Sequence, residues 1–164
     1  MRTQKEEYFL DLALRCARQG TCLRRNFGAI IVDAHKTIVA SGYSGSPAGT
    51  PHCKTCWRED NNIESGSNYE KCRSVHAEQN ALLQAGKSAR GCDLYLAGYD
   101  VKSGEVVAGK PCYICTKMIV NAGINKIIVY DPKSILNYVV YIPEELFKIY
   151  DKQIFTLNAG SGYK

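Results

Sequence analysis

Apolar and polar residues follow one another along the chain with a spacing that changes between segments. Residues 4–19 carry apolar side chains at helical spacing with charges between them, and Gly20 is a suitable C-terminal stop. Two apolar, β-branched runs at 27–32 and 37–40 are separated by a short polar connection, which predicts a β-hairpin. Residues 42–73 are rich in Gly, Ser, Asn and Pro and show neither period, so we expect a long loop there.

The second half of the chain alternates between helical and strand-like segments. The predicted helices are residues 76–85, 111–120 and, more weakly patterned, 143–150, and the predicted strands are residues 93–97 and 126–130. This order favours an α/β fold in which one mixed sheet is covered by helices. The sequence shows no internal repeat, and we expect residues 157–164 to form a loose tail.

Composition places the chain among globular proteins. Its 164 residues fit a single domain over 1–164, and 45% are hydrophobic and 23% charged. The net charge is +5, but the basic residues are scattered, which disfavours an extended nucleic-acid surface. No apolar run approaches the ~18 residues of a membrane span, and the charged N-terminal segment is unlike a signal peptide. We therefore expect a cytoplasmic protein.

The cysteines narrow the chemistry further. The eight cysteines are Cys16, Cys22, Cys53, Cys56, Cys72, Cys92, Cys112 and Cys115. Disulfide frameworks belong to small secreted chains, whereas a domain of this size can fold without them. Two of the pairs, Cys53/Cys56 and Cys112/Cys115, have C-x-x-C spacing, which in a reducing compartment indicates metal ligands or a redox couple.

The second C-x-x-C pair has the surroundings of a catalytic zinc site. Pro111 suits the first turn of a helix, Cys112 and Cys115 share one face, and a helix N-terminus favours thiolates. His76 can be the third ligand, which leaves an open fourth position. Glu78 can stand beside that position only if His76 lies where its helix begins, because residues two apart in mid-helix point about 200° apart.

These residues predict a hydrolytic deamination. H-x-E followed by P-C-x-x-C is the signature of zinc-dependent nucleobase deaminases. Zinc lowers the pKa of bound water to about 7. Glu78 would accept the released proton and deliver it to the ring nitrogen and then to the leaving amine.

Five stretches carry a resemblance to a known family. They are residues 26–32, 42–49, 75–81, 111–115 and 118–124. In this order they resemble the cytidine and deoxycytidylate deaminase superfamily, and specifically its deoxycytidylate (dCMP) deaminase branch. The resemblance implies a three-layer α/β/α sandwich with a mixed, about five-stranded sheet and hydrolysis of dCMP to dUMP and ammonia. It also implies a homo-oligomer, hexamer or dimer, with dCTP and dTTP as effectors.

Some members of this branch carry a second, structural zinc in addition to the catalytic one. The ligands that the resemblance suggests here are Cys22, Cys53, Cys56 and Cys72. Such a site would clamp the 42–73 loop to the sheet, with His52 as a substitute ligand. The alternative is that these cysteines are buried free thiols, as we expect of Cys16 and Cys92.

Two departures from the branch concern the substrate. Ser44 replaces the asparagine of the family's Gly-Tyr-Asn-Gly loop, and residues 98–110 form an insertion at the lip of the pocket. The base could therefore belong to another cytosine nucleotide or be a different aminated heterocycle. The predicted substrate contacts are Arg24, Asn26, Ser44 and Ala77, and the candidates for a phosphate are Arg24, Arg25, Asn26 and Lys110.

Two other functions share parts of the pattern. A tRNA adenosine deaminase has the same two motifs, but the scattered basic charge and the extra cysteines disfavour it. A non-enzymatic zinc module would join both C-x-x-C pairs in one site. Cys56 and Cys112 lie much further apart than the ~15–20 residues of a zinc ribbon, and His76 and Glu78 would then have no role.

Overall fold

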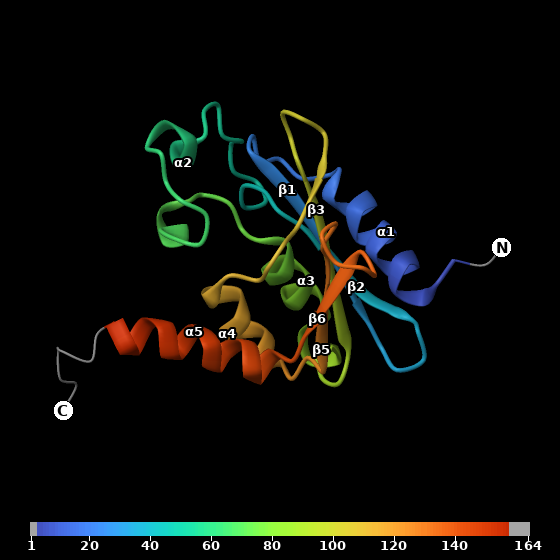
Figure 1. Cartoon of the computed structure of the whole chain (residues 1–164). Coiled ribbons are helices and arrows are strands. Elements are labelled where there is room, and N and C mark those ends of the chain that lie inside the picture. Colours follow the sequence, from blue (N-terminus) through green and yellow to red (C-terminus); the bar gives the residue numbers. More distant parts are fainter. Residues whose placement is uncertain (1–2, 158–164) are drawn as a thin grey trace.

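A mixed β-sheet forms the centre of the structure, a computed structural model that describes residues 3–157 (Figure 1). The strands are β1 (Arg25–Val32), β2 (Ile38–Tyr43), β3 (Asp93–Asp100), β4 (Val106–Val107), β5 (Lys126–Tyr130) and β6 (Tyr138–Tyr141). Their order is β2-β1-β3-β5-β6, with β4 paired to β3. Among the described strands, β3 and β5 are parallel, and the other pairs are antiparallel.

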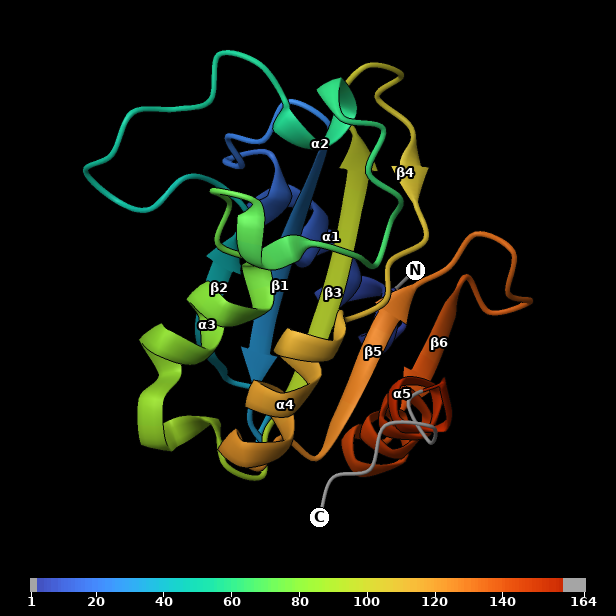
Figure 2. The same ribbon diagram turned by 90° about the vertical axis from the view of Figure 1, so that its left-hand side faces the viewer.

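Helices cover both faces of this sheet. The main helices are α1 (Lys5–Ala17), α3 (Ala77–Ala85), α4 (Tyr113–Ala122) and α5 (Pro143–Leu157). Figure 1 shows α1 on one side and α3, α4 and α5 on the other, and Figure 2 shows α3 and α4 in front of the strands. The shorter helices are α2 (Trp57–Asp60), η1 (Tyr69–Lys71) and η2 (Gly86–Ala89). The predicted three-layer α/β/α sandwich is confirmed.

The alternation of side chains along the central strands creates two cores. On β3, Leu94 and Leu96 join the core that also contains residues of α3, α4 and α5. The intervening Tyr95 and Ala97 join the other core, together with Phe9 and the rest of the apolar face of α1. A strand buried on both faces reads as a continuous apolar run, and this explains the sequence pattern of the sheet centre.

Some elements differ from the sequence prediction. The predicted loop at 42–73 contains α2 and η1, and β4 falls within the 98–110 insertion. The short strand β6 was not predicted, and α5 is longer than expected because it continues to Leu157. The rest of the tail predicted at 157–164 lies outside the described residues. Within residues 3–157, no helix combines the length and apolarity needed to cross a membrane.

A close backbone approach fixes α3 against the sheet. A Cβ atom at Gly42 on β2 would lie 2.4 Å from both the Ala77 carbonyl oxygen and the Ala81 nitrogen. Only glycine permits this approach, since any side chain would push the first turns of α3 away. The functional residues at the start of α3 therefore depend on a glycine in the neighbouring strand.

Candidate metal centre and active site

Three side chains from two helix N-termini converge at one point. The Nδ1 atom of His76 lies 3.5 Å from Cys112 Sγ and 3.4 Å from Cys115 Sγ. The three ligand atoms lie within 4.8 Å of one another, and among residues 3–157 no other group of three or more His, Cys, Asp or Glu does so. Zinc bonds of about 2.0 Å to nitrogen and 2.3 Å to sulfur at tetrahedral angles would separate these atoms by about 3.5 Å. The donor set therefore fits zinc.

Both helices present their ligands through their first turn. His76 is the N-cap of α3, with extended backbone, and its N–H donates to Gln79 Oε1 at 2.9 Å. Cys112 is the N-cap of α4, and its sulfur accepts from the Cys115 N–H at 3.5 Å. His76 thus stands at the helix start, where the sequence analysis required it. Pro111 precedes the cap and does not lie inside the first turn as predicted.

The protonation of the two sulfurs is coupled through their contact. The hydrogen bond from Cys115 is the main cause that lowers the pKa of Cys112 to about 4, and His76 contributes as well. The same contact, followed by burial, raises the pKa of Cys115. Burial alone would lower the pKa of His76, but its hydrogen bond to Cys112 and the charge of Glu78 give a net rise. The contact between the two sulfurs therefore favours a thiolate at Cys112.

Glu78 is buried next to these ligands. Its side chain is on the first turn of α3, only 4% exposed, and it lines the same cavity as His76 and Cys112. Burial is the main cause that raises the pKa of its carboxyl, and the charge of His76 opposes this rise. A carboxyl in such surroundings is suited to proton transfer.

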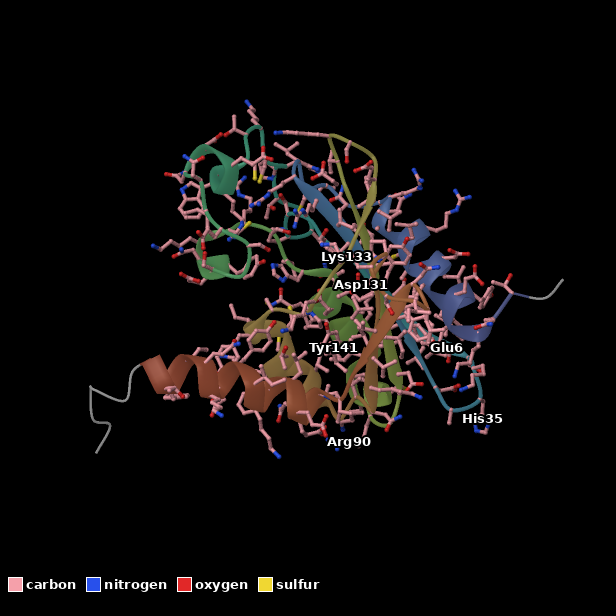
Figure 3. The ribbon with its side chains drawn as sticks, viewed as in Figure 1. Glu6, His35, Arg90, Asp131, Lys133 and Tyr141 are labelled. Atoms are coloured by element: carbon pink, nitrogen blue, oxygen red, sulfur yellow. The ribbon has the colours of Figure 1, made fainter. Side chains whose placement is uncertain are left out.

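The cavity in front of the site has a volume of about 790 Å³. This volume lies within the usual range for small-molecule sites. Its basic lining residues are Arg24, Arg25, Lys54, Arg58, Lys71, Arg73 and Lys110, and its acidic ones are Glu78 and Asp131. Figure 3 labels Asp131, directly after β5, and Tyr141, at the end of β6, both of which line the cavity. The excess of cations favours an anionic ligand.

The predicted substrate contacts divide into two groups. Arg24, Ser44 and Ala77 line the cavity, as do Arg25 and Lys110. Asn26 is not among the lining residues. Its amide is 3% exposed, donates to the Gly20 carbonyl at 3.1 Å and accepts from the Cys22 N–H at 3.0 Å. Its observed role is to hold the connection between α1 and β1.

The cysteines of the predicted second zinc site line the same cavity. They are Cys22, Cys53, Cys56 and Cys72. Within residues 3–157, no three of their sulfurs approach one another as closely as the ligands around His76. Cys22 Sγ lies 3.0 Å from Ser74 Oγ, and burial, followed by the charges of Cys72 and Cys53, raises the pKa of Cys22. His52 is exposed and does not line the cavity.

Comparison with known proteins places the chain in a family. The model of the "Cytidine and deoxycytidylate deaminase zinc-binding region" matches residues 3–131. The chain belongs to this family. The predicted superfamily and its dCMP deaminase branch are thereby confirmed, and the fold agrees with them.

Several named relatives of this deaminase family resemble the chain. The deoxycytidylate deaminase of Mycobacterium phage D29 is 34% identical over 129 residues, which cover 75% of this chain and 91% of that protein. The deoxycytidylate deaminase of Schizosaccharomyces pombe is 29% identical over 75% of this chain, which spans only 36% of the yeast protein. The dCMP deaminase of cyanophage S-TIM5, solved with dCMP and dUMP, is 30% identical with a TM-score of 0.56, covering 77% of this chain and 81% of that one.

The deaminase motifs do not include every residue that shapes this site. Arg58 in α2 is 6% exposed and donates to the carbonyls of Ser67 and Glu64, both at 2.5 Å. Its guanidinium lies 4.4 Å from the ring centroid of Tyr69, whose ring meets the His76 ring edge-on at 4.7 Å. This chain of contacts was not predicted, because no sequence spacing relates Arg58 to His76.

Proposed function

We propose that the protein is a zinc-dependent deaminase that converts dCMP and water to dUMP and ammonia. The observation that carries the proposal is the convergence of His76, Cys112 and Cys115 beside the buried Glu78 in a cation-lined cavity. The names of the phage and yeast relatives support dCMP as the substrate.

In this proposal His76 Nδ1 and the two sulfurs hold the catalytic zinc. A zinc ion with three protein ligands leaves one position for water, whose pKa it lowers to about 7. The Glu78 carboxylate would take one proton from the attacking water and pass it to the ring nitrogen. It would then take the second proton from the hydroxyl now bonded to the ring carbon and pass it to the amine, which leaves as ammonia. Burial of Glu78 keeps bulk water away from this transfer.

The charges around the cavity suggest how a nucleotide would be oriented. The base must reach Glu78, so the phosphate would point toward the mouth of the cavity. Arg24, Arg25 and Lys110 line the cavity and are the candidates for this contact. Ser44 Oγ accepts from the Phe27 N–H at 3.0 Å, and its side chain also hydrogen-bonds to Cys22, so it would position the cavity wall rather than offer an unused donor.

The substrate can be tested by ammonia release. Purified, zinc-loaded protein is offered dCMP, CMP, dCTP, cytidine, adenosine and guanine separately. We expect turnover of dCMP to exceed that of cytidine at equal concentration. Preferential turnover of another compound would assign the site to that compound and contradict the proposed substrate.

We also propose a second, structural zinc held by Cys22, Cys53, Cys56 and Cys72. All four line the same cavity, which supports the proposal, and their sulfurs would have to move closer together to bind the ion. Metal analysis should give two zinc ions per chain and one in the double variant Cys53→Ser, Cys56→Ser. One ion in both proteins would contradict the second site.

The assembly, regulation and location are further parts of the proposal. We propose a homo-oligomer with dCTP as activator and dTTP as inhibitor, which light scattering and effector titrations can test. A cytoplasmic location suits the proposed thiolate ligands, because the glutathione pool there keeps cysteines reduced.

A further inference from the structure

The last part of the described chain contacts the segment that leads into α4. We call this segment, residues 110–112, the arm that carries Cys112. We call Tyr138–Leu157 the C-terminal unit; it comprises β6 and α5, and the family match ends before it, at residue 131. The ring of Tyr113 stacks on Phe147 with centroids 5.9 Å apart, and its hydroxyl donates to Asp151 Oδ1 at 3.4 Å. These contacts join α5 to the first turn of α4.

Tyr150 makes the contact nearest to the metal ligands. Its hydroxyl donates to the Pro111 carbonyl at 2.8 Å. Its ring lies 4.8 Å from Lys110 Nζ, which is also 6.0 Å from the ring of Tyr141. Tyr150 therefore contacts both residues that immediately precede Cys112, but its hydrogen bond goes to Pro111.

The orientation of the Pro111 carbonyl affects where the next residue, Cys112, lies. The peptide unit that contains this carbonyl ends at the nitrogen of Cys112, so rotation of the unit redirects the N-cap of α4. Proline has no N–H, and the segment cannot be tied down through a donor at this residue. The carbonyl is thus the backbone group of Pro111 through which a neighbouring element can fix the arm.

We propose that Tyr150 is a positioning residue, which keeps Cys112 within metal-binding distance of His76 by holding the Pro111 carbonyl. The proposal rests on the proposed function, in that it takes His76, Cys112 and Cys115 as the zinc ligands. It assigns α5 a part in the site that the family-matched region does not contain. The hydroxyl acts through the backbone and does not touch the substrate.

The test compares Tyr150→Phe with wild type. This change removes one hydrogen bond and keeps the ring, so the variant should fold. The free energy of one hydrogen bond corresponds to about a three- to tenfold change in a rate. We therefore expect the variant to release zinc faster than wild type by this factor, at a fixed chelator concentration and well below Tm. For dCMP, kcat per bound zinc should fall by a similar factor while KM stays unchanged.

Tyr138→Phe is the matched control. Tyr138 belongs to the same unit, and no side-chain hydrogen bond of its hydroxyl is found among residues 3–157. This variant should release zinc at the wild-type rate. Tyr150→Leu, which also removes the ring beside Lys110, should release zinc at least as fast as Tyr150→Phe.

Each outcome decides between positioning and simple packing. Wild-type zinc release and unchanged kcat in Tyr150→Phe, even with a lower Tm, would overturn the proposal. Faster zinc release in Tyr150→Phe would uphold it even if wild-type protein fails to deaminate dCMP, and only the proposed function would then be wrong.

Discussion

One added methyl group at Gly42 should damage the site without touching any of the predicted zinc ligands. The new Cβ would lie 2.4 Å from the Ala77 oxygen and the Ala81 nitrogen, and 3.0 Å from the Ala81 Cα, all backbone atoms of α3. An ordinary contact requires a shift of roughly 1 Å, and overpacking of this kind costs about 1–3 kcal/mol of the free energy of unfolding. A displacement of about 1 Å near reacting groups can lower kcat about 100-fold.

Gly28→Ala provides the control for this substitution. A Cβ there would lie 2.0 Å from the Ala13 oxygen and 2.5 Å from the Ala17 nitrogen, so it would push α1 on the opposite face of the sheet. Urea unfolding should show both variants destabilised. Ammonia release per mole of folded, zinc-loaded protein should fall steeply only in Gly42→Ala. Equal kcat in the two variants would refute the argument that Gly42 sets the position of α3.

Three further perturbations test other parts of the site. Lys110→Met should raise KM for dCMP about tenfold and leave kcat unchanged, since it removes one charged contact with the phosphate. Deoxycytidine has no phosphate, so its turnover should not change. An equal effect on deoxycytidine would contradict a phosphate role for Lys110. Arg58→Lys should lower Tm by about 4 °C in calorimetry, because lysine cannot bind both the Ser67 and Glu64 carbonyls while covering Tyr69. At a free zinc concentration about 1,000 times Kd, bound zinc should stabilise the fold by about 4 kcal/mol. Removing the zinc with a chelator should therefore lower Tm. An unchanged Tm would argue against a bound ion.

The parts of the fold that sequence predicted are those with a strong local pattern. The strands β1, β3 and β5 give continuous apolar runs and α1 shows a helical period, so the type and order of these elements follow from the sequence. The short strand β4 has two residues and β6 has four, too few to show a period. Their pairing depends on the neighbouring strand and not on their own composition.

The same division applies to the site. His76, Glu78, Cys112 and Cys115 were predicted because metal chemistry restricts both residue type and spacing. Asn26 was predicted as a substrate contact from its place in a motif, but its amide bonds to the chain around Gly20. Tyr150 was missed because its contact with Pro111 joins residues far apart in sequence. Contacts of this kind join residues at no fixed spacing, so a sequence pattern cannot reveal them.

The most direct test of the account is ammonia release from dCMP by wild type and Glu78→Gln, with bound zinc measured in the same samples. Glutamine keeps the size of the side chain but cannot accept the proton from water. We predict equal zinc content and equal Tm, with turnover lowered at least about 100-fold in the variant. Wild-type turnover in Glu78→Gln would contradict the proposed mechanism, and no dCMP turnover by the zinc-loaded wild type would contradict the proposed function itself.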